Sequence, residues 1–272
     1  MNNLDIPTQT SRESGEVGWN QKVIDRANAE IGTLHLVDDI DCPICMNRGY
    51  SLYGDEEYIT QKECSCMVAR RSAKNAKRSG LGKLLKHKLE DYIIRKPFQK
   101  VVKDAAEDYL KSESTDWFVL LGQSGAGKTH VCSAIANVLL SRGKEVSYIS
   151  WQDFMSEVKK QVPKGDEKYF MEIRDVEVLY IDDFLKSKPT TFELDIAYRL
   201  LNSRYSRQLA TLISSERFLT EKNRNALDGL VIMDEAIAGR IKESAGNYIT
   251  EIKNDDANNY RMGNHQQQEG GH

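Results

Sequence analysis

The chain has 272 residues and a formal net charge of -3 at pH 7. This length allows one large domain, or a medium domain with a small one, and a hydrophobic content of 40% is enough to build a core. No apolar run approaches the ~20 residues of a membrane-spanning helix, and the N-terminus lacks a basic-then-apolar secretory signal. We therefore expect a soluble, cytoplasmic protein with no membrane partner.

A polar segment and a cysteine-rich segment come first in the chain. Residues 1–37 show little hydrophobic pattern and are expected to be a flexible N-terminus. Residues 38–68 contain a Cys-x-x-Cys pair and, after eighteen residues, a Cys-x-Cys pair. Two close pairs of thiolates on tight turns are typical of a tetrahedral Zn²⁺ site. The ligands of this zinc-binding module would be Cys42, Cys45, Cys64 and Cys66. Its role would be structural, because four protein thiolates leave no open coordination position.

The alternative for these cysteines is a redox pair, since Cys-x-x-Cys also occurs in thioredoxin-like sites. That interpretation needs a βαβ context, which the surrounding sequence lacks. Gly49 and Gly54 would allow a hairpin between the two pairs, and domains of this size rarely fold without a metal or a disulfide. The fifth cysteine, Cys132, is expected to be a buried thiol.

Residues 69–110 are charged and favour helix, with breaks at Ser79-Gly80 and at Pro97. Between Arg70 and Lys103 there are twelve Lys and Arg residues and two carboxylates. We expect a basic helical linker. Its cations could contact phosphate or an acidic protein face, or could form a solvated helical surface.

Strand-like and helix-like stretches alternate over residues 111–262. The predicted strands are 117–121, 145–150, 178–181, 210–214 and 248–252, and the predicted helices are 128–142, 151–162, 192–208 and 232–244. Such alternation predicts an α/β domain with a mostly parallel sheet and helices on both faces. Residues 263–272 are rich in Gln and Gly and are expected to be a disordered tail.

The stretch Gly122-Gln123-Ser124-Gly125-Ala126-Gly127-Lys128-Thr129 matches the P-loop pattern at every fixed position. A predicted strand precedes it and a predicted helix follows it, which is the context that such a match requires; the alternative is a chance glycine turn. The glycines let backbone N–H groups surround phosphate oxygens, and the helix N-terminus favours negative charge. Lys128 would reach the β- and γ-phosphates of ATP, and the Thr129 hydroxyl would bind Mg²⁺.

A second motif supplies carboxylates. The apolar strand at 178–181 ends in Asp182 and Asp183. In a P-loop ATPase, Asp182 would hold Mg²⁺ through water and Asp183 would orient or deprotonate the attacking water. Most hydrolases of this class have Glu at the second position, and Asp is one methylene shorter, so hydrolysis is expected to be slow. The alternative is that the acidic pair caps a helix.

Phosphoryl transfer also needs positive charge at the transition state. Arg240, on a predicted helix, and Arg261, beyond the last predicted strand, are candidate catalytic residues. Taken alone, each is also typical of an ordinary surface arginine.

Together these motifs resemble the AAA+ helicase-loader ATPases of bacteria and their phages, the DnaC/DnaI-like family. The resemblance covers roughly residues 40–262. The residues that carry it are Gly122 to Ile135, including His130 after the P-loop, Tyr180 to Phe184, Asn202 to Tyr205, Ser214 to Glu216 and Gly239 to Ile241. The upstream cysteine pairs and the basic stretch resemble the zinc-binding N-terminal region of the phage and Gram-positive branch.

The resemblance implies an AAA+ core with a five-stranded parallel sheet, in which His130 joins the P-loop residues at the nucleotide. It implies ATP-dependent assembly into a homo-oligomer with a replicative DNA helicase, and contact with single-stranded DNA. Arg240 corresponds to the arginine finger acting on a neighbour's ATP, and Arg261 to the second sensor acting in its own chain. The first sensor is usually Asn, where this chain has Ser214-Ser215-Glu216.

The leading interpretation is an ATP-hydrolysing helicase loader that needs ATP, Mg²⁺ and Zn²⁺. One alternative is an ATPase that assists a transposase, although such proteins usually lack the cysteine pairs. Another is a non-catalytic adaptor that binds ATP as a latch and sequesters a helicase, which the Asp in place of Glu leaves open.

Overall fold

The computed structural model describes residues 18–161, 164–220 and 229–253. The chain divides into two compact units, Met1–Arg70 and Arg71–His272. We call them the cysteine unit and the ATPase unit. The expected C-terminal tail, 263–272, lies outside the described residues.

The cysteine unit is built around a short hairpin. Its elements are α1 (Trp19–Ala29), α2 (His35–Asp38), β1 (Tyr50–Gly54), β2 (Ile59–Glu63) and the start of α3 (Cys66–Arg78). The two strands are antiparallel, with Tyr50 opposite Glu63. Helix α1 lies in the segment expected to be flexible. The Asn28 side chain explains the difference, because its amide donates to the Leu52 carbonyl at 2.8 Å and accepts from the Leu52 N–H at 2.9 Å. This tertiary contact leaves no periodic signal in the sequence.

The segment expected to be a linker is instead part of the ATPase unit. From Arg71 on, it forms the rest of α3, the 3₁₀ helix η1 (Gly82–Lys86) and helix α4 (Pro97–Ser112). Val102, Ala106 and Tyr109 of α4 are buried in the same core as α5. The charged residues lie between apolar positions that face this core, which explains why composition alone suggested a linker.

The ATPase unit contains a five-stranded parallel sheet in the order β4-β5-β6-β3-β7. Its strands are β3 (Phe118–Gly122), β4 (Val146–Ser150), β5 (Val178–Asp182), β6 (Ala210–Ser214) and β7 (Ile249–Ile252). Each lies within one residue of its predicted bounds, so the predicted fold class is confirmed. Strand β6 separates the P-loop strand β3 from the acidic strand β5.

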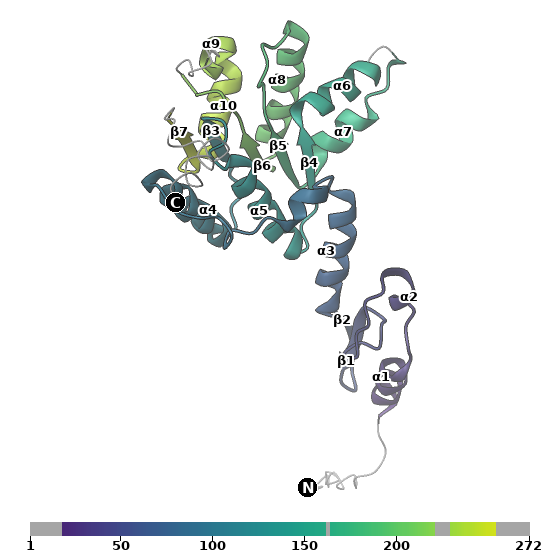
Figure 1. Cartoon of the computed structure of the whole chain (residues 1–272). Helices are drawn as coiled ribbons and strands as arrows, with labels where there is room; N and C mark the ends of the chain where they lie inside the picture. The colour runs from purple at the N-terminus through teal and green to yellow at the C-terminus, as the bar shows by residue number, and fades with distance from the viewer. Residues whose placement is uncertain (1–17, 162–163, 221–228, 254–272) are drawn as a thin grey trace, which may run out of the picture. The chain divides into compact units, whose positions relative to one another are not determined.

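Helices cover both faces of this sheet (Figure 1). Besides α4, they are α5 (Lys128–Ser141), α6 (Trp151–Gln161), α7 (Lys168–Asp175), α8 (Thr191–Ser206), α9 (Leu230–Met233) and α10 (Glu235–Ala245). Alternate residues of β3 point to opposite faces. Val119 and Leu121 pack with α6, α7, α8 and α10, whereas Phe118 and Leu120 pack with α4 and α5.

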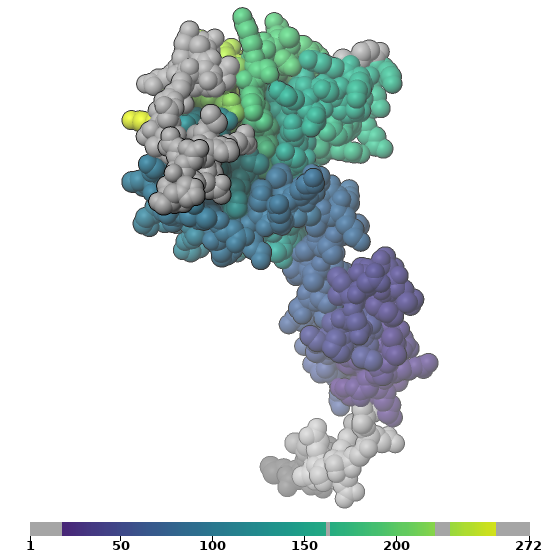
Figure 2. Space-filling view, in the orientation of Figure 1, coloured from purple at the N-terminus to yellow at the C-terminus, as the bar shows by residue number. Residues whose placement is uncertain are grey.

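Helix α7 was not predicted. It has eight residues and buries only Phe170 and Ile173, which is too few apolar positions to show a helical period. It packs against α8, and Figure 2 shows the teal and green residues of these helices side by side on the surface.

Candidate nucleotide site and cysteine cluster

The glycine loop follows β3 directly, and two of its residues have a backbone conformation that only glycine adopts easily. Gly122 and Gly127 have φ angles of 99° and 86°. A Cβ atom at Gly122 would lie 2.2 Å from the Ile252 carbonyl oxygen, and one at Gly127 would lie 2.8 Å from Tyr92 Cε2. The loop therefore fits tightly between β7 and the segment before α4, and α5 begins directly after it at Lys128.

Lys128 lies folded back on its own loop. Its Nζ donates to the carbonyl oxygens of Gly122 at 2.8 Å and Gln123 at 2.6 Å. The side chain is buried, and this burial lowers the pKa of the ammonium to about 8, although Glu216 and Asp183 act in the opposite direction. A group of phosphate oxygens at this loop would favour the charged form.

The first carboxylate meets the P-loop helix across β6. Asp182 Oδ1 accepts hydrogen bonds from Thr129 Oγ1, at 3.1 Å, and from Ser214 Oγ. Tyr148 OH lies 3.4 Å from the other carboxylate oxygen. The structure thus brings together the hydroxyl and the carboxylate that the sequence assigned to Mg²⁺, and hard oxygen ligands of this kind suit that ion.

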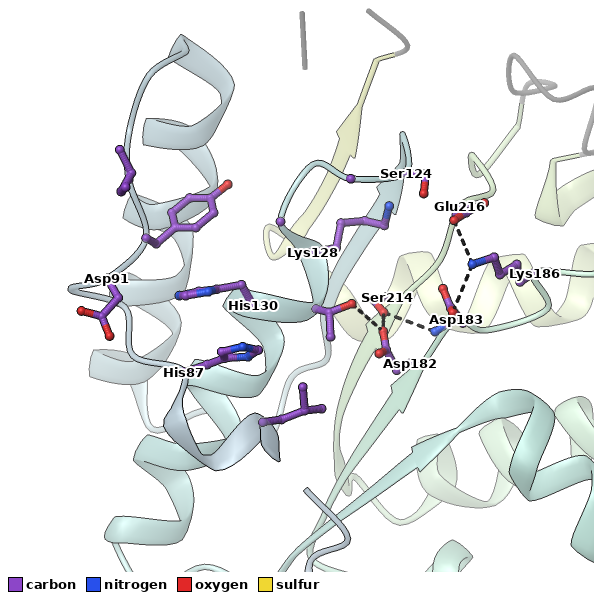
Figure 3. Close-up of a pocket in the computed structure, with 16 residues that line it drawn as sticks. His87, Asp91, Ser124, Lys128, His130, Asp182, Asp183, Lys186, Ser214 and Glu216 are labelled. Atoms are coloured by element: carbon purple, nitrogen blue, oxygen red, sulfur yellow. Dashed lines mark hydrogen bonds and ion pairs between the residues drawn. The ribbon is translucent and has the colours of Figure 1, made fainter. Parts of the chain in front are cut away.

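The second carboxylate belongs to a network that the sequence did not predict. Lys186 Nζ lies 3.2 Å from Asp183 Oδ2 and 3.1 Å from Glu216 Oε1 (Figure 3). Burial would raise the pKa of Glu216, but the Ser124 hydroxyl and Lys186 outweigh it and lower this pKa. Glu216 thereby connects the glycine loop to the ion pair at Asp183. The charged run after the acidic strand was the available signal for Lys186.

The cavity beside the P-loop has a volume of about 600 Å³. One wall comes from the segment expected to be a linker. It includes Leu84, His87, Asp91, Tyr92 and Ile93. The His87 and His130 rings stack with centroids 4.6 Å apart and planes at 20°, and His130 Nε2 donates to the Lys88 carbonyl at 2.8 Å. Sequence reasoning missed this wall; the apolar run at 92–94 within a basic stretch was the signal.

The two candidate arginines are placed differently. Arg240, on α10, contacts α8 and is not among the described residues that line the cavity. It therefore does not face the nucleotide site of its own chain. Arg261 lies outside the described residues.

The four predicted zinc ligands converge in the cysteine unit. Their Sγ atoms all lie within 4.8 Å of one another, with Cys42–Cys64 at 3.8 Å and Cys45–Cys66 at 3.6 Å. A tetrahedron with Zn–S bonds of ~2.3 Å has S···S edges of ~3.8 Å, so the donor set fits Zn²⁺.

Thiol environments in this cluster differ. Burial opposes ionisation of both Cys45 and Cys66. The Gly49 N–H, 3.3 Å from Cys45 Sγ, nevertheless lowers the pKa of Cys45, whereas the pKa of Cys66 is raised. A divalent cation at the centre would favour the thiolate form of all four.

Comparison with known proteins decides the family. Residues 52–268 match the profile of the IstB-like ATP binding protein family. The chain belongs to this family. None of the helices in the described ranges is long and apolar enough to cross a membrane.

Relatives of this IstB-like protein include replication proteins. It is 30% identical to XkdC, a protein of the phage-like element PBSX of Bacillus subtilis, over 78% of this chain and 82% of that one. It is 27% identical to the replicative helicase loader DnaC of Buchnera aphidicola, over 60% of this chain and 68% of that one. A crystal structure of DnaI, 21% identical, superposes with a TM-score of 0.52 over 63% of this chain and 93% of that one. This last likeness concerns the fold.

Proposed function

We propose that this protein is an ATP-hydrolysing helicase loader, which binds a replicative DNA helicase and assists its placement on single-stranded DNA in replication initiation. The observation that carries the ATPase part is the convergence of Lys128, Thr129 and Asp182 at one edge of the sheet. The loader part rests on the similarity to DnaC.

At the phosphates, each residue has a distinct task. Lys128 exchanges its bonds with two loop carbonyls for bonds with the β- and γ-phosphates. Thr129 and Asp182 hold Mg²⁺, which neutralises charge that develops on the phosphate oxygens. Asp183 orients the attacking water. The wall made by His87, Tyr92 and His130 encloses the base.

Two arginines complete the proposed site. Arg240 acts on ATP held by a neighbouring copy; in support, it contacts α8 and is not among the described residues that line the cavity of its own chain. Arg261 acts in its own chain as a second sensor. Because Arg240 acts on a neighbour's ATP, the protein is expected to form a homo-oligomer in its assembled state. We place this assembly in the cytoplasm.

The Cys cluster binds Zn²⁺ in this proposal. Four buried or half-buried thiols leave no position for a substrate, so the ion stabilises the cysteine unit and takes no part in hydrolysis.

The test separates binding from turnover. Lys128→Ala should abolish ATP binding, whereas Asp183→Asn should bind ATP normally and lose about 10²- to 10⁴-fold in hydrolysis, the usual contribution of a general base. Hydrolysis is measured with and without a single-stranded oligonucleotide, and helicase capture by pull-down with ATP. Parent-rate hydrolysis by Asp183→Asn would remove Asp183 from its role, and capture of a transposase in place of a helicase would refute the loader function.

One observation favours a second candidate, the ATP-latched adaptor. Lys186 Nζ lies 3.2 Å from Asp183 Oδ2, so one carboxylate oxygen of Asp183 is already engaged in an ion pair instead of facing an attacking water. In an adaptor, helicase capture would need ATP but would survive Asp183→Asn unchanged, and the parent protein would show no turnover.

A further inference from the structure

The motif Asn202-Ser203-Arg204-Tyr205 on α8 is not part of the nucleotide site described above. One member of it has a purely structural explanation. Arg204 is fully buried and donates to the carbonyl oxygens of Val176 at 2.9 Å and Ala210 at 2.6 Å, and to Thr211 Oγ1 at 2.9 Å. It thus ties the end of α7 to the start of β6.

The opposite side of α8 faces α10 (Figure 1). There Asn202 Oδ1 accepts a hydrogen bond from Arg240 Nε at 2.6 Å, and Tyr198 OH lies 3.3 Å from Arg240 Nη2. The guanidinium carbon lies 4.9 Å from the centroid of the Tyr198 ring and 5.7 Å from that of Tyr205. Tyr205 is held in turn by its hydroxyl, which donates to Glu243 Oε1 at 2.7 Å.

These contacts fix the guanidinium in position and orientation. A guanidinium has five N–H groups. Among the described residues, Asn202, Tyr198 and the Ala236 carbonyl, 3.2 Å from Nη1, take one each. Two N–H groups thus remain for oxygens of another molecule. Aromatic faces hold an arginine without using its N–H groups, so these groups stay available for hydrogen bonds to another molecule.

We propose that Asn202 and Tyr198 are positioning residues for Arg240, which hold its guanidinium in the orientation that meets the ATP of a neighbouring copy. The inference rests on the proposed action of Arg240 in trans. It gives the two halves of the motif separate tasks: Arg204 stabilises the fold, and Asn202 aims the arginine.

The experiment uses mixtures of full-length variants, at concentrations where the parent protein assembles with ATP and oligo(dT). Asn202→Ala should lose about 10- to 100-fold in kcat, the range expected when a catalytic group is misplaced by about 1 Å, with unchanged ATP affinity. Asn202→Asp keeps an acceptor for Nε and should retain more activity than Ala. Ser203→Ala, in the same motif, is the matched control and should match the parent.

Mixing then assigns the defect to one side of the subunit interface. Lys128→Ala has no working pocket but presents an intact Arg240, so adding it to Asn202→Ala should restore hydrolysis. If Asn202 supports only the fold of its own chain, the mixture stays inactive, which overturns the proposal. Unchanged kcat in Asn202→Ala also overturns it.

Arg240→Ala in the same mixture separates the positioning role of Asn202 from the proposed role of Arg240 at a neighbour's ATP, on which it rests. If Arg240→Ala is restored by Lys128→Ala and Asn202→Ala is not, only the positioning role fails. If Arg240→Ala is itself not restored in a mixture that assembles, the trans role of Arg240 fails, and the positioning role fails with it.

Discussion

The cysteine unit and the ATPase unit are each stabilised internally by a different kind of interaction. In the ATPase unit, large aliphatic and aromatic side chains fill both faces of the sheet. In the described part of the cysteine unit, the buried hydrophobic residues are Ile24 and three cysteines, while Leu36, Val37 and Ile44 are exposed. The larger unit can fold by apolar burial, but the smaller one has too little apolar area to bury.

Hydrogen bonds and an ion pair position the cysteines in the cysteine unit. Asn47 has a φ of 62°, and its side-chain oxygen accepts from the Cys42 N–H at 2.7 Å. Arg70 is buried, pairs with Asp38 and donates to the Ile40 carbonyl at 2.7 Å. These bonds orient the cysteines, but each contributes only about 1 kcal/mol net. We therefore expect a metal ion held by the four thiols to supply most of the stability of this unit.

The largest expected effect is that of metal removal. Structural zinc in small domains contributes about 10–16 kcal/mol of apparent folding free energy, so chelation should unfold the cysteine unit and leave ATP binding intact. Elemental analysis should find one Zn²⁺ per chain in the parent and none in Cys45→Ser. Cys132→Ala is the control and should keep its zinc. Metal retained in Cys45→Ser, or unchanged proteolysis of residues 18–70 after chelation, would contradict a metal-dependent unit.

The converse change acts on the ATPase unit alone. Leu212 is fully buried in the centre of the sheet, and truncating a buried leucine costs about 2–5 kcal/mol. Leu212→Ala should lower the Tm of the ATPase unit and weaken ATP binding near that temperature, while zinc content stays at that of the parent. Thermal unfolding followed by ATP-analogue fluorescence measures the first, and metal analysis the second. Loss of zinc in this variant would mean that the two units do not fold independently.

How far the sequence predicts each unit follows from the same difference. The five strands were predicted within one residue, because fully buried parallel strands are continuous apolar runs such as 117–121 and 178–181. The P-loop was predicted from its glycine pattern, which is recognisable because a residue with a side chain would not fit at these positions. The cysteine spacing was sufficient to group four thiols that are up to twenty-four residues apart.

What the sequence did not predict depends on contacts between distant residues. Helix α1 is bound to the hairpin by the side chains of Asn20 and Asn28, and α4 belongs to the ATPase core despite its basic surroundings. The ion pair of Lys186 and Glu216 joins two residues that are thirty positions apart in the sequence, one after the end of β5 and the other after the end of β6. The asparagine contacts and the ion pair have no periodic or spacing signal, because tertiary geometry produces them, whereas the apolar positions of α4 at 102, 106 and 109 are periodic but do not say which core they join.

A smaller effect is expected from the polar framework of the cysteine unit. Arg70→Ala removes the partner of Asp38 and the donor to the Ile40 carbonyl. It should cost about 1–3 kcal/mol, the usual penalty for leaving such groups unsatisfied, and weaken zinc affinity about 10- to 100-fold. Competition with a chromogenic chelator measures the affinity. Lys74→Ala, exposed on the same helix, is the control; equal zinc affinity in the two variants would show that Arg70 does not support the ligands.

The smallest effect concerns Lys128, a buried cation of the ATPase unit. Arg70 is paired with a carboxylate, whereas Lys128 is held by two carbonyl oxygens, and burial lowers its pKa to about 8. ATP favours the charged lysine, so the pKa rises on binding. Affinity should therefore be constant below about pH 8 and fall by at most roughly tenfold per pH unit above it, since one pKa unit equals about 1.4 kcal/mol. Titration with a fluorescent ATP analogue between about pH 7 and 9.5, at fixed Mg²⁺, measures this slope. Lys128→Arg stays charged throughout this range, so the slope should be absent from that variant. The same slope in Lys128→Arg would assign the titration to another group, and no slope in the parent would mean that Lys128 is charged before ATP arrives.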